Sequence, residues 1–177
     1  MMLDDLLAAA PGLRRFRGIN ATMLAALLER EPYECVCCGG GVPKSRRNWC
    51  GDDCVKAFRL RCDPASGRDY VIETSRGICA ECGADTIPAE REWRAAQRAA
   101  GIWPKGFRPG GPTEDHPVFA RGVWREVDHV VPVCEGGGLC GPEGLRLLCG
   151  RCHHEATRRL AKRMMERRRA ARARCEA

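Results

Sequence analysis

The chain has few aromatic residues and no long apolar run. Phe, Trp and Tyr make up 6% of its 177 residues, whereas Asp, Glu, Lys and Arg make up 30%. No apolar stretch approaches the roughly 20 residues of a membrane-spanning helix, which argues against a transmembrane protein. This composition leaves a thin core for one domain with small satellites, so we expect zinc sites to add stability.

The amino terminus lacks the basic segment that begins a signal peptide. Its first residues, MMLDDLLAAAPGL, carry acids instead. We therefore expect a cytoplasmic protein in which the 13 cysteines are reduced. In that setting, paired CxxC spacings indicate zinc ligands more than disulfides.

Cysteine spacing predicts a first structural zinc site early in the chain. A CxxC knuckle is followed by a CxxxC pair that fits the first turn of a helix, and the ligands are Cys35, Cys38, Cys50 and Cys54. Cys37 is an alternative to Cys35, but the CxxCG spacing makes the better knuckle because Gly39 relaxes the backbone beside the metal. A redox-active CxxC is the weaker interpretation, since no thioredoxin-like pattern surrounds it.

A second zinc site is predicted from two distant CxxC knuckles. Its ligands are Cys79, Cys82, Cys149 and Cys152. Such a site ties an incoming strand to the start of the last helix and closes a long loop. We expect the loss of one ligand to loosen the whole surrounding domain.

Local patterns predict a small α+β protein. Residues 3–30 suit a helix pair broken at Pro11-Gly12, with Asn20 or Thr22 as a cap. A turn at Asp63-Pro64 and a short strand near residues 70–72 are expected next. Further predictions are a helix at 88–100, a loop at 101–117 with a surface His116, strands within 123–133 and 145–148, a helix at 153–174, and core positions for Trp93, Trp103 and Trp124.

Positive charge gathers in the last helix. The formal net charge is +7, and much of the excess follows residue 157. This distribution indicates a polyanion as partner, and DNA backbone contact is the favoured interpretation over a merely solvated or membrane-bound helix. The residues expected to contact DNA are Arg158, Arg159, Lys162 and Arg163.

Three potential catalytic side chains lie between Trp124 and Thr157, a stretch with three of the four histidines. Asp128 and His129 end the first predicted strand, and His153 opens the basic helix. Carboxylate oxygen and imidazole nitrogen suit a divalent ion, and an imidazole can accept a proton near neutral pH.

This pattern resembles the HNH endonuclease family, whose core is a ββα-metal fold. The likeness runs from about Cys50 to about Arg168 and is strongest to the HNH domains that end annealing-helicase nucleases. The residues that carry it are Val127-Asp128-His129, Pro132, Gly136-Gly137-Gly138, Leu145-Arg146-Leu147-Leu148-Cys149 and Cys152-His153.

The resemblance implies a metal-dependent DNA endonuclease. It gives His129 the role of general base and assigns one divalent ion, Mg²⁺ or another, to Asp128 and His153. Gly144 departs from the family, which usually has Asn there, so Glu143, a backbone carbonyl or water would have to replace its side chain. A catalytically inactive zinc-stabilised DNA-binding module and a structural interaction domain are the alternatives.

The expected organisation has three parts. Residues 1–32 form a helical segment, residues 33–62 a four-cysteine zinc-finger module, and residues 63–177 the HNH nuclease domain with its structural zinc and basic helix.

Overall fold

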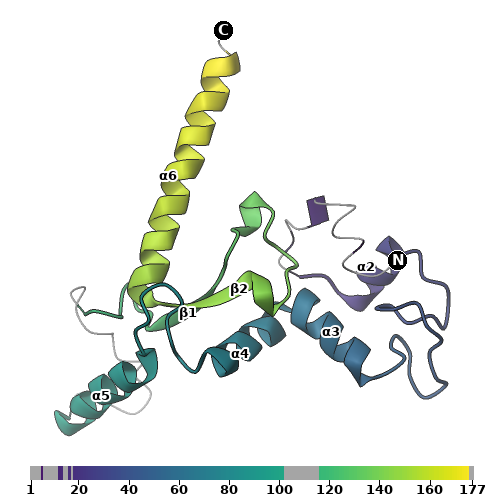
Figure 1. Cartoon of the computed structure of the whole chain (residues 1–177), viewed down its shortest axis with the longest axis horizontal. Helices are drawn as coiled ribbons and strands as arrows, with labels where there is room; N and C mark the ends of the chain where they lie inside the picture. Colours follow the sequence, from purple (N-terminus) through teal and green to yellow (C-terminus); the bar gives the residue numbers. More distant parts are fainter. Residues whose placement is uncertain (1–4, 6–11, 14–15, 17, 102–115, 176–177) are drawn as a thin grey trace. The chain divides into compact units, whose positions relative to one another are not determined.

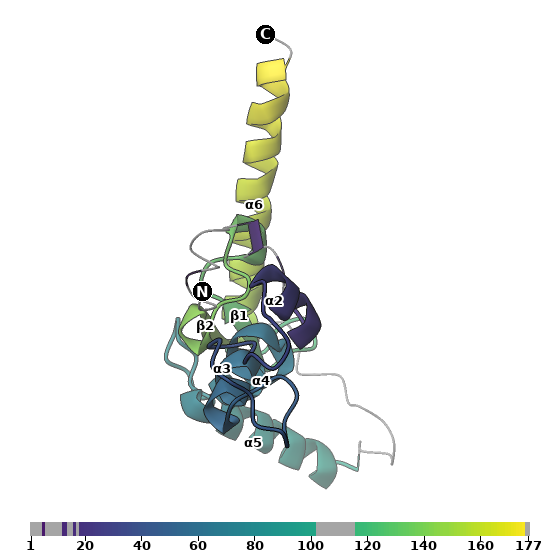
Figure 2. The ribbon, with the colours of Figure 1, turned by 90° about the vertical axis from the view of Figure 1, so that its right-hand side faces the viewer.

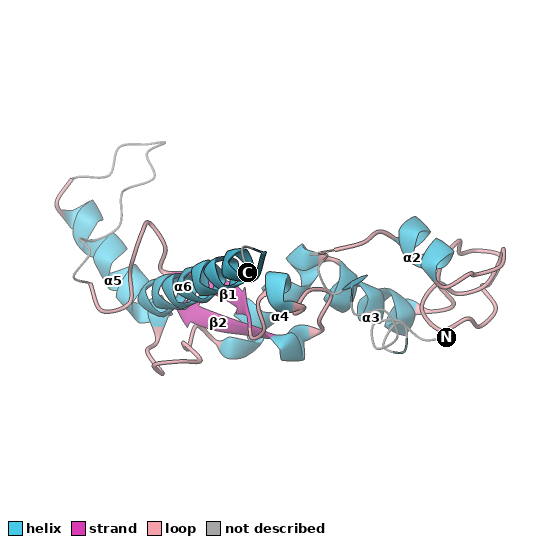
Figure 3. Cartoon of the chain, turned by 90° about the horizontal axis from the view of Figure 1, so that it is seen from above, coloured by secondary structure: helices cyan, strands magenta, loops and turns pink. Residues whose placement is uncertain are grey.

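A computed structural model describes residues 5, 12–13, 16, 18–101 and 116–175. Helices dominate the described residues, and the two strands lie side by side in one small sheet (Figure 3). The α+β class predicted from the sequence is therefore confirmed. The elements in order are α2 (Ala21–Leu27), α3 (Asp52–Cys62), α4 (Pro64–Ser75), α5 (Thr86–Ala99), β1 (Arg125–His129), η2 (Val133–Glu135), η3 (Pro142–Gly144), β2 (Leu145–Cys149) and α6 (Gly150–Cys175).

The chain forms two compact units. The first comprises Met1–Thr74 with His129–Arg146, and the second comprises Ser75–Asp128 with Leu147–Ala177. Among the described residues, each unit has its own apolar cluster and its own cysteine cluster. The three-part organisation expected from the sequence stays a prediction.

The apolar cluster of the first unit is built around α2. Asn20 caps this helix by accepting a hydrogen bond from the Met23 amide at 2.8 Å, so Asn20 rather than Thr22 is the cap. Leu24 is fully buried on the inner face of the helix. The buried members of the cluster are Ile19, Leu24, Leu28, Val36, Cys62 and Leu139. Most of the helix predicted before Pro11 lies outside the described residues.

Residues 64–75 form a helix, so the short strand predicted near residues 70–72 is wrong. Asp63 accepts hydrogen bonds from the Ala65 amide at 3.2 Å and the Ser66 hydroxyl at 2.6 Å. Pro64 occupies the first helical position, where its missing N–H costs nothing. The Asp-Pro pair is thus a helix start rather than an isolated turn, and this local signal outweighs the strand preference of the following β-branched residues.

The apolar cluster of the second unit surrounds Trp124. Its ring lies 5.8 Å from that of Trp93 and 5.1 Å from that of Phe119, which confirms the core positions predicted for Trp93 and Trp124. His116 was expected at the surface, but it is half-buried, with its ring edge 4.9 Å from Trp124. Trp103 and most of the predicted loop lie outside the described residues.

β2 continues directly into α6 without an intervening residue (Figure 1). Gly150 makes this junction possible, because a Cβ there would lie only 2.0 Å from the Val123 carbonyl oxygen. Its amide lies between the carbonyl oxygens of Val118 and Trp124, at 2.9 and 3.0 Å. α6 then runs uninterrupted to Cys175 and begins three residues before the predicted start at His153 (Figure 2).

Within the described ranges, no helix has the length and apolar character to cross a membrane.

Candidate functional site

The four cysteines predicted for the first zinc site come together. Their sulfur atoms all lie within 4.8 Å of one another in the group Cys35, Cys38, Cys50 and Cys54. The sulfur of Cys50 lies 3.5 Å from those of both Cys38 and Cys54. The alternative ligand, Cys37, is outside this group. Four thiolates at this spacing are a donor set that suits tetrahedral Zn²⁺, so the cluster could hold a structural zinc ion.

A tight backbone knuckle prepares Cys35 for metal binding. Gly39 adopts a φ of +76°, which a side chain would oppose, and its amide donates to the Cys35 carbonyl at 2.8 Å. Burial opposes ionisation of the Cys35 thiol. Backbone N–H groups of Cys38, Cys50 and Cys37 outweigh burial and lower the pKa of Cys35 to about 6.

The second predicted set also comes together, although its members are far apart in the chain. The sulfur atoms of Cys79, Cys82, Cys149 and Cys152 lie within 4.8 Å of one another. Cys149 ends β2, and its sulfur accepts a hydrogen bond from the Cys152 amide at 3.4 Å. The Ala80 amide donates to the Leu147 carbonyl at 2.8 Å and joins the knuckle to β2. This cluster could likewise hold zinc.

Ionisation in the second cluster follows the same physics as in the first. Burial opposes it, but backbone N–H groups of Cys149, Cys82 and Glu81 lower the pKa of Cys79 to about 7. Burial and the neighbouring thiols Cys149 and Cys82 raise the pKa of Cys152. The thiolates repel one another, and a bound cation would remove that repulsion.

The three side chains proposed for catalysis come from β1 and α6. Asp128 and His129 are the last two residues of β1, and both are half-buried. His153 is half-buried in the first turn of α6 and directly follows the cluster member Cys152. Asp128 and His153 belong to the second unit. Among the described His, Cys, Asp and Glu side chains, only the two cysteine sets bring three or more ligand atoms within 4.8 Å of one another. Asp128 and His153 belong to neither set.

Gly144 stands where the resembled family has Asn. Its carbonyl accepts a hydrogen bond from the Val130 amide at 2.9 Å, one residue after His129. A Cβ at Gly144 would lie 2.4 Å from the Cβ of Cys140, so Cys140 takes the space in which an Asn side chain would begin. Glu143, which could have replaced the Asn, pairs with Arg61 at 3.1 Å.

The basic residues predicted to contact DNA lie in three different settings on α6. Arg159 pairs with Glu81 at 2.7 Å and with Glu155 at 3.7 Å. Arg158 instead lines a cavity of about 280 Å³, and the other lining residues are Ala120, Arg121, Arg151, His154 and Glu155. Lys162 and Arg163, also predicted to contact DNA, are exposed farther along the helix.

Sequence reasoning missed Arg121 and Arg151. Arg121 lies 29 residues before the start of α6, and only the fold brings it to the helix. Arg151 carried a detectable signal, because its seven-residue spacing from Arg158 is two turns of a helix and places both side chains on one face.

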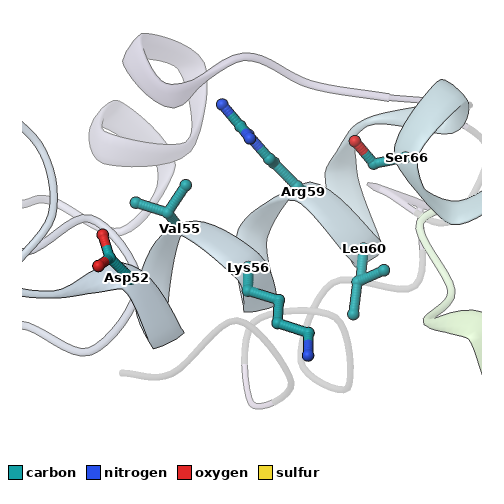
Figure 4. A pocket seen from close by; sticks show the side chains of 6 residues that line it. All are labelled: Asp52, Val55, Lys56, Arg59, Leu60 and Ser66. Carbon is teal, nitrogen blue, oxygen red and sulfur yellow. The ribbon is translucent and has the colours of Figure 1, made fainter. Parts of the chain in front are cut away.

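A cavity of about 380 Å³ in the first unit follows α3 (Figure 4). It is lined by Asp52, Val55, Lys56, Arg59, Leu60 and Ser66. Its charged residues carry both signs, and Asp52 is already paired with Arg46 at 2.8 Å. This lining does not favour one class of charged ligand.

The chain is similar to part of the protein named DNA annealing helicase and endonuclease ZRANB3 in three mammals. It is 31% identical to the Mus musculus protein over 120 residues, 30% identical to the Homo sapiens protein over 124 residues and 28% identical to the Bos taurus protein over 120 residues. Each match covers 64% of this chain but only 11% of the relative.

No family model matches the chain. No solved structure matches it either. The resemblance to annealing-helicase nucleases inferred from the sequence is thus confirmed as a distant, partial match. The element order β1, β2, α6 agrees with the expected strand–strand–helix order, while membership of the HNH family and its ββα-metal fold stays a prediction.

Proposed function

We propose that the chain is a metal-dependent DNA endonuclease of the HNH type. The observation that carries this proposal is the second cysteine cluster, in which Cys149 and Cys152 bracket the junction of β2 and α6. His153 follows this bracket directly, and the strand that ends in Asp128 and His129 pairs with β2. The partial matches to proteins named as DNA annealing helicases and endonucleases support the same activity.

Hydrolysis of a phosphodiester needs an attacking hydroxide and stabilisation of the charge that develops on phosphate. In this proposal, the Asp128 carboxylate and the His153 imidazole would hold one divalent ion, Mg²⁺ or another. That ion would supply neutralisation of charge on the phosphate and the leaving oxygen. A ring nitrogen of His129 takes the proton from the attacking water, which an imidazole does well near neutral pH.

The backbone around Gly144 supports the role of His129 in the absence of the family's Asn. The Gly144 carbonyl accepts a hydrogen bond from the Val130 amide, and this bond fixes the backbone directly after His129. We infer that this bond contributes to orienting the general base. Glu143 is occupied by Arg61 and is the weaker candidate for that task.

A nicking assay on supercoiled, branched and single-stranded DNA with added Mg²⁺ or Mn²⁺ tests the proposal. We expect His129→Asn to lower the cleavage rate by about 10²–10⁴-fold, which is the usual contribution of a general base, with zinc content unchanged. His116→Asn is the matched control. Its amide oxygen can replace the His116 ring nitrogen that accepts from Val118 at 3.3 Å, so cleavage should persist. Full zinc content without cleavage of any DNA form would rule the nuclease out.

A catalytically inactive, zinc-stabilised DNA-binding module is the second candidate. Gly144 in the place of Asn is the observation that favours it. This function predicts DNA binding that weakens steeply with salt, without cleavage and without an effect of His129→Asn on binding.

A further inference from the structure

The cavity of about 280 Å³ at the start of α6 lies wholly within the second unit. Two segments build it: residues 120–121 of a tight turn, and the first turns of α6. Arg121, Arg151 and Arg158 line it together with the imidazole of His154. The cavity is therefore enclosed mainly by nitrogen donors that the two segments bring together.

The turn that presents Arg121 has a demanding backbone. Ala120 and Val123 exchange two backbone hydrogen bonds of 3.2 and 3.0 Å, and Arg121 and Gly122 between them have φ values of +49° and +80°. Positive φ at both central residues is typical of a two-residue type I′ turn. An Arg with positive φ is uncommon and persists only where surrounding contacts impose it.

Gly150 provides those contacts. A Cβ there would lie 2.7 Å from the Ala120 nitrogen and 2.0 Å from the Val123 oxygen, so the turn packs directly on the helix start. The Arg121 turn and α6 are thus held at a close and specific distance. The fold therefore sets the positions of the two backbone segments that line this cavity.

The helix side of the cavity carries more basic than acidic side chains, with Glu155 as its one acid among the lining residues. Arg151, His154 and Arg158 follow the i, i+3, i+7 spacing of one helix face. Among the residues that the structure describes, none forms an ion pair with Arg121, Arg151 or Arg158. Glu155 also lines the cavity, but it interacts with Arg159 at 3.7 Å. The N-terminal end of α6 adds the positive end of a helix dipole.

We propose that this cavity is a phosphate-binding subsite for a nucleic-acid strand, formed by Arg121, Arg151, His154 and Arg158. The inference rests on DNA as the partner in the proposed function and adds which residues receive its phosphate. Guanidinium groups match phosphate oxygens in bidentate geometry, and here three arginines from two separate segments line one cavity.

The same helix face extends the subsite into a track. Arg151, Arg158, Lys162 and Arg169 are spaced by seven, four and seven residues, so they lie close to one line along α6. At 1.5 Å per residue, this line is about 27 Å long. A phosphate in the cavity would therefore lie at one end of a row of basic side chains that can contact further phosphates.

DNA binding without added divalent ion, followed by fluorescence anisotropy, tests the subsite before any cleavage occurs. We compare Arg121→Asn, which tolerates positive φ, and Arg151→Gln with Arg91→Gln. Arg91 is exposed on α5 in the same unit and does not line the cavity, so its variant loses the same charge elsewhere. We expect each cavity variant to weaken binding about tenfold and to reduce the salt slope by about 1, with Arg91→Gln like wild type. Cavity variants that bind like Arg91→Gln would overturn the subsite.

The phosphate itself is either an internal diester or the terminal monoester of a strand end. Binding is therefore measured on one oligonucleotide with and without a 5′-phosphate. An Arg121→Asn defect that appears only with the 5′-phosphate assigns the cavity to a strand end. An equal defect on both assigns it to an internal phosphate.

The subsite and the nuclease can fail separately. Weaker binding by the cavity variants in a protein that never cleaves DNA retains the subsite and rejects the nuclease. Cleavage that depends on His129, with normal binding by the cavity variants, retains the nuclease and rejects the subsite.

Discussion

The two cysteine clusters have the same donor set but join very different lengths of chain. The first gathers its ligands between residues 35 and 54, beside one short helix start. The second joins a knuckle at residues 79–82 to residues 149 and 152, at the boundary of β2 and α6. A metal ion in the first cluster would therefore stabilise a local loop, whereas one in the second would also fix the junction on which the proposed active site depends.

The two clusters are therefore expected to differ in how much of the chain depends on them. Closing a long loop with metal ligands restricts the unfolded chain more than closing a short loop. Because each cluster lies in its own compact unit, we expect each loss to be felt in one unit. The predictions below use matched changes in the two units.

The largest effect is expected from removing one exposed ligand of each cluster. Cys82→Ser and Cys38→Ser both replace the second cysteine of a knuckle at an exposed position. Structural zinc contributes about 10 kcal/mol or more to the folding of small zinc domains, so each variant should lose one zinc ion and the order of its unit. Native mass spectrometry counts the zinc, and hydrogen exchange locates the disorder.

Cys82→Ser should lose protection at Leu147 and Leu148 of β2, whereas Cys38→Ser should keep it. Equal loss of β2 protection in both variants would show that the clusters stabilise one cooperative structure, and the contrast between them would then be wrong.

Core truncations should have the next largest effect. Leu24 of the first unit and Leu148 of the second are both fully buried. Replacing either with Ala should lower the free energy of unfolding of its unit by about 2–5 kcal/mol, because it removes apolar contacts and leaves a cavity. Urea unfolding followed by hydrogen exchange measures each unit. A truncation that destabilises mainly the other unit would contradict the division.

Gly144→Asn should destabilise the first unit by about 1–3 kcal/mol, because its Cβ would collide with that of Cys140. Adding Cys140→Gly removes the obstructing atom and should recover part of the loss. A double-mutant cycle on the free energy of unfolding measures this coupling. Additive effects would mean that Cys140 does not exclude the Asn side chain, and exchange at Leu148 in the second unit is the control.

The smallest difference concerns acid release of zinc. The pKa of Cys79 is lowered to about 7 and that of Cys35 to about 6, both from an ordinary value of 9.0. The stabilisation of each thiolate is complete above pH 9 and is lost as the pH falls through its folded pKa. The second cluster should therefore release zinc at a higher pH than the first.

A chromogenic chelator follows this release, and each cluster is measured alone in the variant that lacks the other zinc. The Cys38→Ser variant retains zinc only in the second cluster, and the Cys82→Ser variant retains it only in the first. Release at the same pH, or first from the Cys35 cluster, would contradict the order.

Much of this fold could be read from residue spacing, because cysteine knuckles and helix periods are local signals. Both cysteine sets and the basic helix were predicted in this way. The strand predicted near residues 70–72 is wrong because two local signals favour a helix. The side-chain cap from Asp63 and the proline at the first helical position outweigh the strand preference of Val71 and Ile72. The predicted start of α6, His153, is three residues late. The helix begins at Gly150, a residue whose place there depends on close contact with the distant Val123 and so has no local signal.

The candidate site was less accessible from sequence. Asp128, His129 and His153 were named from a resemblance, and their catalytic roles stay predictions. Arg121 could not be found, because only a type I′ turn packed on Gly150 brings it to α6. Its neighbours give no helical or strand period that would place it there.

No residue separates β2 from α6, so the end of the strand fixes the direction in which each basic side chain of α6 points. One residue inserted after Cys149 would turn every side chain of α6 by about 100° relative to the sheet. Arg158 and Lys162 would then leave the line that starts beside Arg121. A change in the length of the chain at this junction would therefore displace all of these basic residues together, whereas replacing one of them would remove a single charge.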